Sequence, residues 1–205
     1  MRSLTAALAA LLLAACASAP DRPAAPEASS GFRAGVTGTT AARHMAAAAN
    51  PLAAEAGREI LRAGGSAVDA TIAMQMVLTL VEPQSSGVGG GAFLLHFDGK
   101  RVQSFDGRET APMAVDENLF MAGGKPMAFY ESAVGGRSVG TPGVLRLLEE
   151  AHKQHGRLPW PMLFEPSIRL ADAGFPVSPR LHALLKDDKY LRADPAALAY
   201  CYQAD

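Results

Sequence analysis

Residues 82–97 read EPQSSGVGGGAFLLHF, and within this stretch the pattern of apolar residues changes from helical to extended. Upstream, residues 66–81 are apolar on nearly every side, which is typical of a buried central helix. Pro83 and the glycines that follow it end that helix. The apolar run over residues 92–97 predicts a strand, Asp98-Gly99 predicts a hairpin turn, and residues 101–105 form the returning strand. Helices followed by paired strands favour a mixed α/β (α+β) fold.

Helix-capping patterns define the other elements. Asn50-Pro51 is typical of a helix start, and Ser66 with Asp69 three residues later forms a capping box. This pattern gives Asp69 a structural role rather than a catalytic one. Thr141-Pro142 is expected to cap a helix that begins at Gly143. The predicted helices span, in chain order, residues 52–63, 66–81, 143–155, 161–173 and 178–189.

The glycine run also fits the spacing of a dinucleotide-binding motif, through Gly87, Gly89 and Ala92, and Asp106 follows at a suitable distance. That motif needs a strand before the glycines and a helix after them, whereas here a helix precedes them and a strand follows. We therefore expect no dinucleotide cofactor. The glycines are better explained by close packing of the backbone, or by backbone amides that contact a ligand.

The first residues have the pattern of an export signal. A charged start is followed by an apolar run over residues 4–15, too short to span a bilayer, and then by Cys16. Because Leu13-Ala14-Ala15-Cys16 resembles the lipobox of bacterial lipoproteins, residues 1–16 are predicted to be a lipoprotein-type signal peptide with a lipidated Cys16. An ordinary cleaved signal is the alternative. Residue 17 is Ala rather than Asp, which resembles outer-membrane sorting, so we expect a periplasmic protein anchored by lipid to the outer membrane.

The remaining chain divides into a tether and a body. Residues 17–40 mix Pro, Ala, Ser and Gly without an apolar period, and are predicted to form an extended, disordered tether. Residues 41–205 are long enough for one hydrophobic core.

Composition excludes several classes of partner. The formal net charge is −1 and no cluster of Lys and Arg is present, so we expect no nucleic-acid partner. The 5 histidines fall in separate segments without the spacing of metal ligands, and we predict no metal site and no cofactor. With Cys16 assigned to the anchor, Cys201 has no partner for an internal disulfide.

Three charged residues crowd the end of the second predicted strand, in the segment FDGRETAP at residues 105–112. Arg108 presents a planar fork that binds both oxygens of a carboxylate and keeps its proton, which suits it to the α-carboxylate of an amino-acid-like substrate. Glu109 or Asp106 could hold that fork in place. The alternative is an ion pair among these three residues with no ligand at all.

Six sequence blocks together resemble the start of γ-glutamyltransferases, also called γ-glutamyltranspeptidases, and they occur in the same order as in that family. The resemblance covers the chain from about residue 41 to its end and leaves out only the signal and the tether. The blocks are NPLA at residues 50–53, GGSAVDA at 64–70, EPQSSGVGGG at 82–91, RETAP at 108–112, VGTPG at 139–143 and FEPSI at 164–168.

The resemblance implies the N-terminal, large-subunit part of an Ntn-hydrolase αββα sandwich, incomplete as given. In that family the precursor cleaves itself, and the new N-terminal threonine of the small subunit attacks the γ-glutamyl amide. Water or an acceptor amino acid or peptide then takes up the glutamyl group. By resemblance Arg108 matches the arginine that binds the substrate α-carboxylate.

The nucleophile is expected to lie outside this chain, which would make the chain inactive alone. Among candidate threonines, Thr37, Thr39 and Thr40 lie in the tether, and Thr141 is accounted for by the predicted helix cap. No catalytic residue is therefore assigned within the chain.

Two other functions remain open at this point. A cephalosporin or glutaryl acylase would keep the same fold and change the substrate. A non-catalytic periplasmic lipoprotein would retain the fold as a binding module. The leading expectation is part of an exported γ-glutamyl transferase and hydrolase that acts on compounds such as glutathione.

Overall fold

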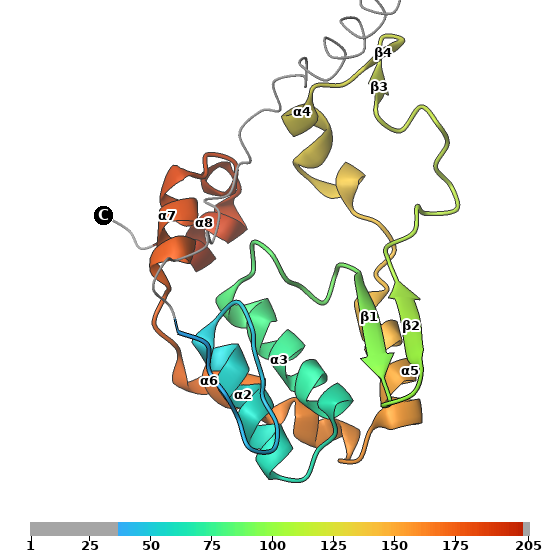
Figure 1. Cartoon of the computed structure of the whole chain (residues 1–205). Coiled ribbons are helices and arrows are strands. Elements are labelled where there is room, and N and C mark those ends of the chain that lie inside the picture. Colours follow the sequence, from blue (N-terminus) through green and yellow to red (C-terminus); the bar gives the residue numbers. More distant parts are fainter. Residues whose placement is uncertain (1–36, 203–205) are drawn as a thin grey trace, which may run out of the picture. The chain divides into compact units, whose positions relative to one another are not determined.

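The computed structural model describes residues 37–202 of the chain (Figure 1). The chain divides into two units, Met1–Gly38 and Thr39–Asp205, and the helices and strands described below belong to the second unit. Within the described residues, none of the helices combines the length and the apolar character that crossing a membrane requires. The predicted signal peptide and most of the predicted tether lie outside the described residues.

Two packed helices, α2 (Pro51–Arg62) and α3 (Ala67–Val81), form the centre of the core. Helix α2 begins where its capping pattern predicted, because the Asn50 side chain accepts a hydrogen bond from the Leu52 amide at 3.0 Å. Every residue of α3 after its first is buried or half-buried, which confirms the prediction of a buried central helix.

Asp69 lies in the first turn of α3 and is fully buried. Its Oδ2 accepts hydrogen bonds from the amides of Ser66 at 2.8 Å, Arg157 at 2.9 Å and Leu158 at 3.2 Å. The Ser66 side chain in turn accepts the Asp69 amide at 3.1 Å, which completes the predicted capping box. Asp69 therefore ties the start of α3 to the loop before Trp160.

The predicted hairpin is present as β1 (Ala92–Phe97) and β2 (Val102–Gly107), paired antiparallel with Phe97 opposite Val102. Side chains alternate between the two faces of the hairpin. One face places Leu94 and Phe105 against the core, beside α5 in Figure 1. The other face is exposed. It carries Ser104, Asp106 and four apolar side chains that are each at least 64% exposed, those of Phe93, Leu95, Phe97 and Val102.

Helix α5 (Val144–His155) packs its apolar face against β2 and α3. The predicted cap by Thr141 is wrong, because Gly143 is the N-cap residue and no side chain caps the helix. The backbone of Thr141 instead pairs with Thr110 as an isolated β-bridge. The amides of Gly143 and Val144 donate to the Gly90 carbonyl at 3.1 and 3.2 Å, so the glycine run supplies the missing cap.

The helix predicted over residues 161–173 is divided into a 3-10 turn, η2 (Trp160–Leu163), and helix α6 (Glu165–Ala173). Pro166 has no amide proton and cannot donate to the carbonyl of Met162, which disfavours a continuous helix here, whereas proline is tolerated in the first turn of α6. Helix α6 packs against α3.

Other elements were partly or wholly missed by the sequence patterns. The helix predicted from Ser178 is present as α7 (Pro179–Asp187), although it ends two residues earlier than expected. The segment between β2 and α5, expected to be a loop, and the last residues carry further short elements. These are β3 (Met121–Ala122), β4 (Lys125–Pro126), α4 (Phe129–Ala133), η1 (Gly136–Ser138), η3 (Leu191–Ala193) and α8 (Pro195–Cys201).

Glu82, the residue that ends α3, is a second buried acidic residue, 4% exposed. Its carboxylate accepts hydrogen bonds from the Asn50 amide group at 3.2 Å and the Gln84 amide group at 2.5 Å. Arg180 of α7 completes the set with Nη1 at 2.7 Å. One carboxylate thus joins the start of α2, the end of α3 and α7.

Candidate functional site

Arg108 lies immediately after β2, at an end of the hairpin that is packed closely on α5. A Cβ atom on Gly107 would lie only 2.5 Å from Cβ of Leu147, so glycine is what lets the strand end against the helix. The Arg108 amide donates to Oδ1 of Asp106 at 2.9 Å, which fixes the turn. The Arg108 side chain is 67% exposed and leaves its guanidinium accessible to a ligand.

Glu109 provides the negative charge next to that guanidinium. Its Oε2 lies 3.0 Å from Nη1 of Arg108 as an ion pair. This oxygen is buried and makes no hydrogen bond with proper geometry among the described residues, so the Arg108 charge is its main partner. Asp106, the other residue considered as a support, contacts the backbone of Arg108 instead.

The glycine run packs directly against Glu109. A Cβ atom on Gly91 would lie 2.6 Å from Oε2 of Glu109, and one on Gly140 would lie 2.8 Å from its Cβ. Neither position tolerates a side chain while Glu109 stays in place. Close backbone packing, the explanation preferred from the sequence, is therefore confirmed for this part of the run.

These residues border a pocket of about 370 Å³. Its lining comes from residues 108–112 after β2, Leu119-Phe120 and residues 137–140 before α5, together with Gly89 of the glycine run. The bridge between Thr110 and Thr141 holds the first and third segments together, with N···O distances of 2.8 and 3.3 Å. The volume is within the range of small-molecule sites.

The pocket also contains a second guanidinium, that of Arg137 in η1. Its Nη1 donates to the Leu119 carbonyl at 2.9 Å and contacts Sδ of Met127 at 3.2 Å. Sequence patterns gave no reason to select Arg137, since it stands in the Gly-rich segment between β4 and α5 with no charged neighbour. With two guanidinium groups and the single carboxylate of Glu109, the lining favours an anionic ligand.

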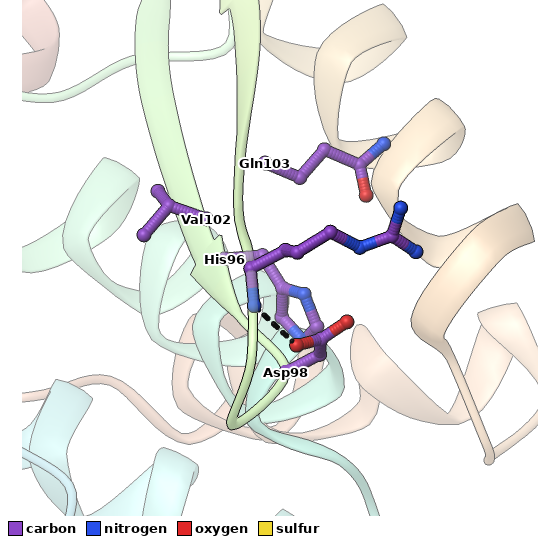
Figure 2. Close-up of a pocket in the computed structure, with 5 residues that line it drawn as sticks. His96, Asp98, Val102 and Gln103 are labelled. Atoms are coloured by element: carbon purple, nitrogen blue, oxygen red, sulfur yellow. Dashed lines mark hydrogen bonds between the residues drawn. The ribbon is translucent and has the colours of Figure 1, made fainter.

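A second pocket, of about 350 Å³, lies at the opposite end of the hairpin (Figure 2). Asp98 closes the turn there by accepting the amides of Lys100 and Arg101, each at 2.8 Å. Both hydrogen bonds lower the pKa of the Asp98 carboxyl, and the one from the Arg101 amide has the larger effect. His96 stacks on His155 of α5 with ring centroids 3.9 Å apart. The geometry of this pocket is that of a closed turn docked on a helix.

The other residues considered from the sequence have structural surroundings or lie outside the described part. Over residues 37–202, no three or more His, Cys, Asp or Glu side chains gather as metal ligands would. Cys201 is a free, half-buried thiol in α8. Cys16 lies outside the described residues.

The chain is similar in sequence and structure to several known proteins. Residues 53–204 match the family model described as Gamma-glutamyltranspeptidase. The chain is 41% identical over 146 residues to the glutathione hydrolase proenzyme of Bacillus subtilis, covering 70% of this chain and 25% of that protein. It is similar to the crystal structure of Helicobacter pylori gamma-glutamyltranspeptidase with a TM-score of 0.75 and 28% identity, over 82% of this chain and 48% of that one.

The structure of a cephalosporin acylase from Bacillus halodurans is also similar, with a TM-score of 0.58 and 35% identity over 76% of this chain and 28% of that one. The chain therefore spans about a quarter of the Bacillus subtilis protein and about half of the Helicobacter pylori chain.

Proposed function

Because this chain belongs to the γ-glutamyltranspeptidase family, we propose that it forms part of an exported enzyme that cleaves γ-glutamyl amides such as glutathione. The enzyme would pass the γ-glutamyl group to water or to an acceptor amino acid or peptide. The fold is the matching part of the Ntn-hydrolase sandwich, as predicted. The observation that carries the proposal is an accessible Arg108 in a pocket with net positive charge, within the matched region.

Arg108 is the residue proposed to bind the α-carboxylate of the substrate. Its fork offers two parallel N–H donors to the two carboxylate oxygens. Glu109 lies against one nitrogen of the fork and is itself fixed between Gly91 and Gly140, so it would orient the guanidinium before the substrate arrives. Glu109 is thus a positioning residue, and Asp106 contributes by fixing the backbone of the turn.

The reacting groups are proposed to come from outside this chain. A threonine hydroxyl, exposed by self-cleavage of a precursor into two subunits, attacks the γ-carbonyl carbon, and the amine leaves with a proton. Water or an acceptor amine then attacks the resulting ester and releases the threonine. The chain alone would bind one end of the substrate and catalyse nothing.

The proposal is tested by comparing two substrates on the complete, processed protein. A γ-glutamyl anilide carries an α-amino group, and the matching glutaryl anilide lacks it. We expect clear preference for the γ-glutamyl anilide. Equal rates, or preference for the glutaryl anilide, would support the second candidate, an acylase, which the 35% identity to a cephalosporin acylase favours.

The same complete protein also distinguishes an enzyme from a non-catalytic binding module. If the complete protein neither cleaves itself into two subunits nor hydrolyses either anilide, the chain belongs to a binding module rather than an enzyme.

We also propose that Cys16 carries a lipid anchor that holds the protein on the periplasmic side of the outer membrane. Support comes from the Leu13-Ala14-Ala15-Cys16 pattern. In cells grown with labelled palmitate, this protein should carry the label and be recovered in the membrane fraction. The Cys16→Ser variant should carry no label and should be absent from the membrane fraction. A Cys16→Ser variant that stays in the membrane fraction would exclude this anchor.

A further inference from the structure

Arg137 is a second cation in the pocket that contains Arg108. The Nη1 atom makes both polar contacts that the structure gives the Arg137 guanidinium, one with the Leu119 carbonyl and one with the Met127 sulfur. Those contacts fix the position of the group. They leave Nε and Nη2, which carry three of the five guanidinium N–H donors, for a ligand.

The charges around the pocket are unbalanced. Glu109 is the acidic residue in the lining, and its buried oxygen is 3.0 Å from Arg108. No carboxylate among residues 37–202 lies within ion-pair distance of Arg137. A guanidinium fixed by neutral acceptors in a ligand-sized pocket attracts an anion.

We propose that Arg137 is a specificity-determining residue that binds a second carboxylate of the substrate. This inference rests on the proposed function. A γ-glutamyl group has one free carboxylate, and Arg108 is assigned to it. The second carboxylate must therefore belong to the group joined to the γ-carbonyl by the amide bond. The preferred substrates are γ-glutamyl compounds whose released portion is itself an acid, such as γ-glutamyl amino acids and peptides.

A carboxylate from the part of the protein beyond this chain is the competing partner for Arg137. In that case Arg137 would stabilise the assembled protein and would not read the substrate. The two possibilities differ in their effect on a matched pair of substrates, because a structural ion pair acts on both substrates alike.

The test uses the complete protein with γ-glutamyl-4-nitroanilide and γ-glutamyl-3-carboxy-4-nitroanilide, which differ by one carboxylate on the released aniline. The measured quantity is the ratio of kcat/KM for the carboxylated substrate to kcat/KM for the plain one. Arg137→Leu should lower this ratio about 10-fold or more, the size of one lost charge-assisted hydrogen bond. The ratio for Arg137→Lys should lie between those of the wild type and Arg137→Leu, because lysine keeps the charge and loses the planar fork.

The control is Arg146→Leu, an exposed arginine of α5 that pairs with Glu149 and should leave the ratio unchanged. An unchanged ratio in Arg137→Leu would overturn the inference and leave the proposed function intact, whether both rates fall together or neither falls. Failure of the wild-type protein to cleave either anilide would overturn the proposed function, and this inference with it.

Discussion

At the scale of single residues, Arg108 differs from the other exposed arginines that the structure describes in being held by a buried carboxylate oxygen, Oε2 of Glu109. Arg108→Lys in the complete protein should keep the charge and lose the two-oxygen fit to the substrate. We expect kcat/KM to fall by an amount equivalent to about 2 kcal/mol, through weaker binding and slower turnover.

Steady-state kinetics with a γ-glutamyl anilide measure this effect. Arg146→Lys, on the exposed face of α5, is the matched control. Unchanged kinetics for Arg108→Lys would show that Arg108 only forms a structural ion pair and does not bind the substrate.

Gly91 is the residue on which the position of Glu109 depends. In Gly91→Ala the new Cβ would meet Oε2 of Glu109 and the Gly107 carbonyl oxygen, each at 2.6 Å. Because one of these neighbours is backbone, the strand end must shift, and we expect a loss of about 1–3 kcal/mol of stability. Urea unfolding of the complete protein measures it.

Gly87→Ala is the control for that measurement, since a Cβ there meets nothing within 4 Å. Similar stability losses in the two variants would contradict close packing at Gly91.

At the scale of elements, two arginines link helices by ion pairs, one with a buried carboxylate and the other with an exposed carboxylate. Arg180 of α7 contacts Glu82, whose side chain is 6% exposed, whereas Arg169 of α6 contacts Glu59 of α2, with side chains 54% and 48% exposed. Arg180→Ala leaves a buried carboxylate without this charge partner and should cost about 3 kcal/mol. Arg169→Ala should cost about 1 kcal/mol or less.

Urea unfolding of the two variants gives both numbers. Equal losses would show that burial of Glu82 does not strengthen its link to α7.

The turn between β1 and β2 carries a dependence on pH through Asp98. Its carboxyl has a pKa below the ordinary value of 3.8, because the carboxylate accepts two backbone amides. A depressed folded-state pKa stabilises the fold at pH values above the ordinary pKa, and this contribution is lost as the pH falls through the folded-state value.

Asp98→Ala should therefore lower Tm at neutral pH and make little difference once the pH has fallen below the folded-state pKa of Asp98. Asp172→Ala, on the exposed surface of α6, is the control. A gap between Asp98→Ala and wild type that widens in acid would contradict this account.

Local patterns predicted the elements whose ends are fixed by their own residues. Asn50 and the Ser66–Asp69 pair cap their helices as expected, because the atoms involved are at most three residues apart. The cap of α5 was mispredicted, because the group that caps it is the Gly90 carbonyl, far away in sequence. Arg108 could be selected from its place at a strand end. Arg137 could not, because only the folded chain brings η1 to the same pocket.

At the scale of the whole molecule, the exposed face of the hairpin indicates what the rest of a longer protein would cover. Leu95 is 73% exposed in this chain and lies on that face between Phe93 and Phe97. An exposed row of large apolar side chains of this kind is characteristic of a buried interface.

In the complete protein, Leu95→Asp should destabilise the fold by several kcal/mol, because it buries a charge. Met113→Asp, at an isolated exposed residue, is the comparison. Thermal unfolding and soluble yield measure both. A loss for Leu95→Asp of about 0.5 kcal/mol or less, as for an ordinary surface change, would show that this face stays in solvent.

The cap that Gly90 gives to α5 has a consequence for how the protein evolves. The glycine run, the segment after β2 and the start of α5 are joined main chain to main chain, through the Gly90 carbonyl and the Thr110–Thr141 bridge. Side chains such as those of Phe120 and Arg137 line the pocket but take no part in these main-chain hydrogen bonds. Mutation can therefore exchange them while the scaffold persists, and descendants of one ancestor can diverge in substrate preference on an unchanged frame.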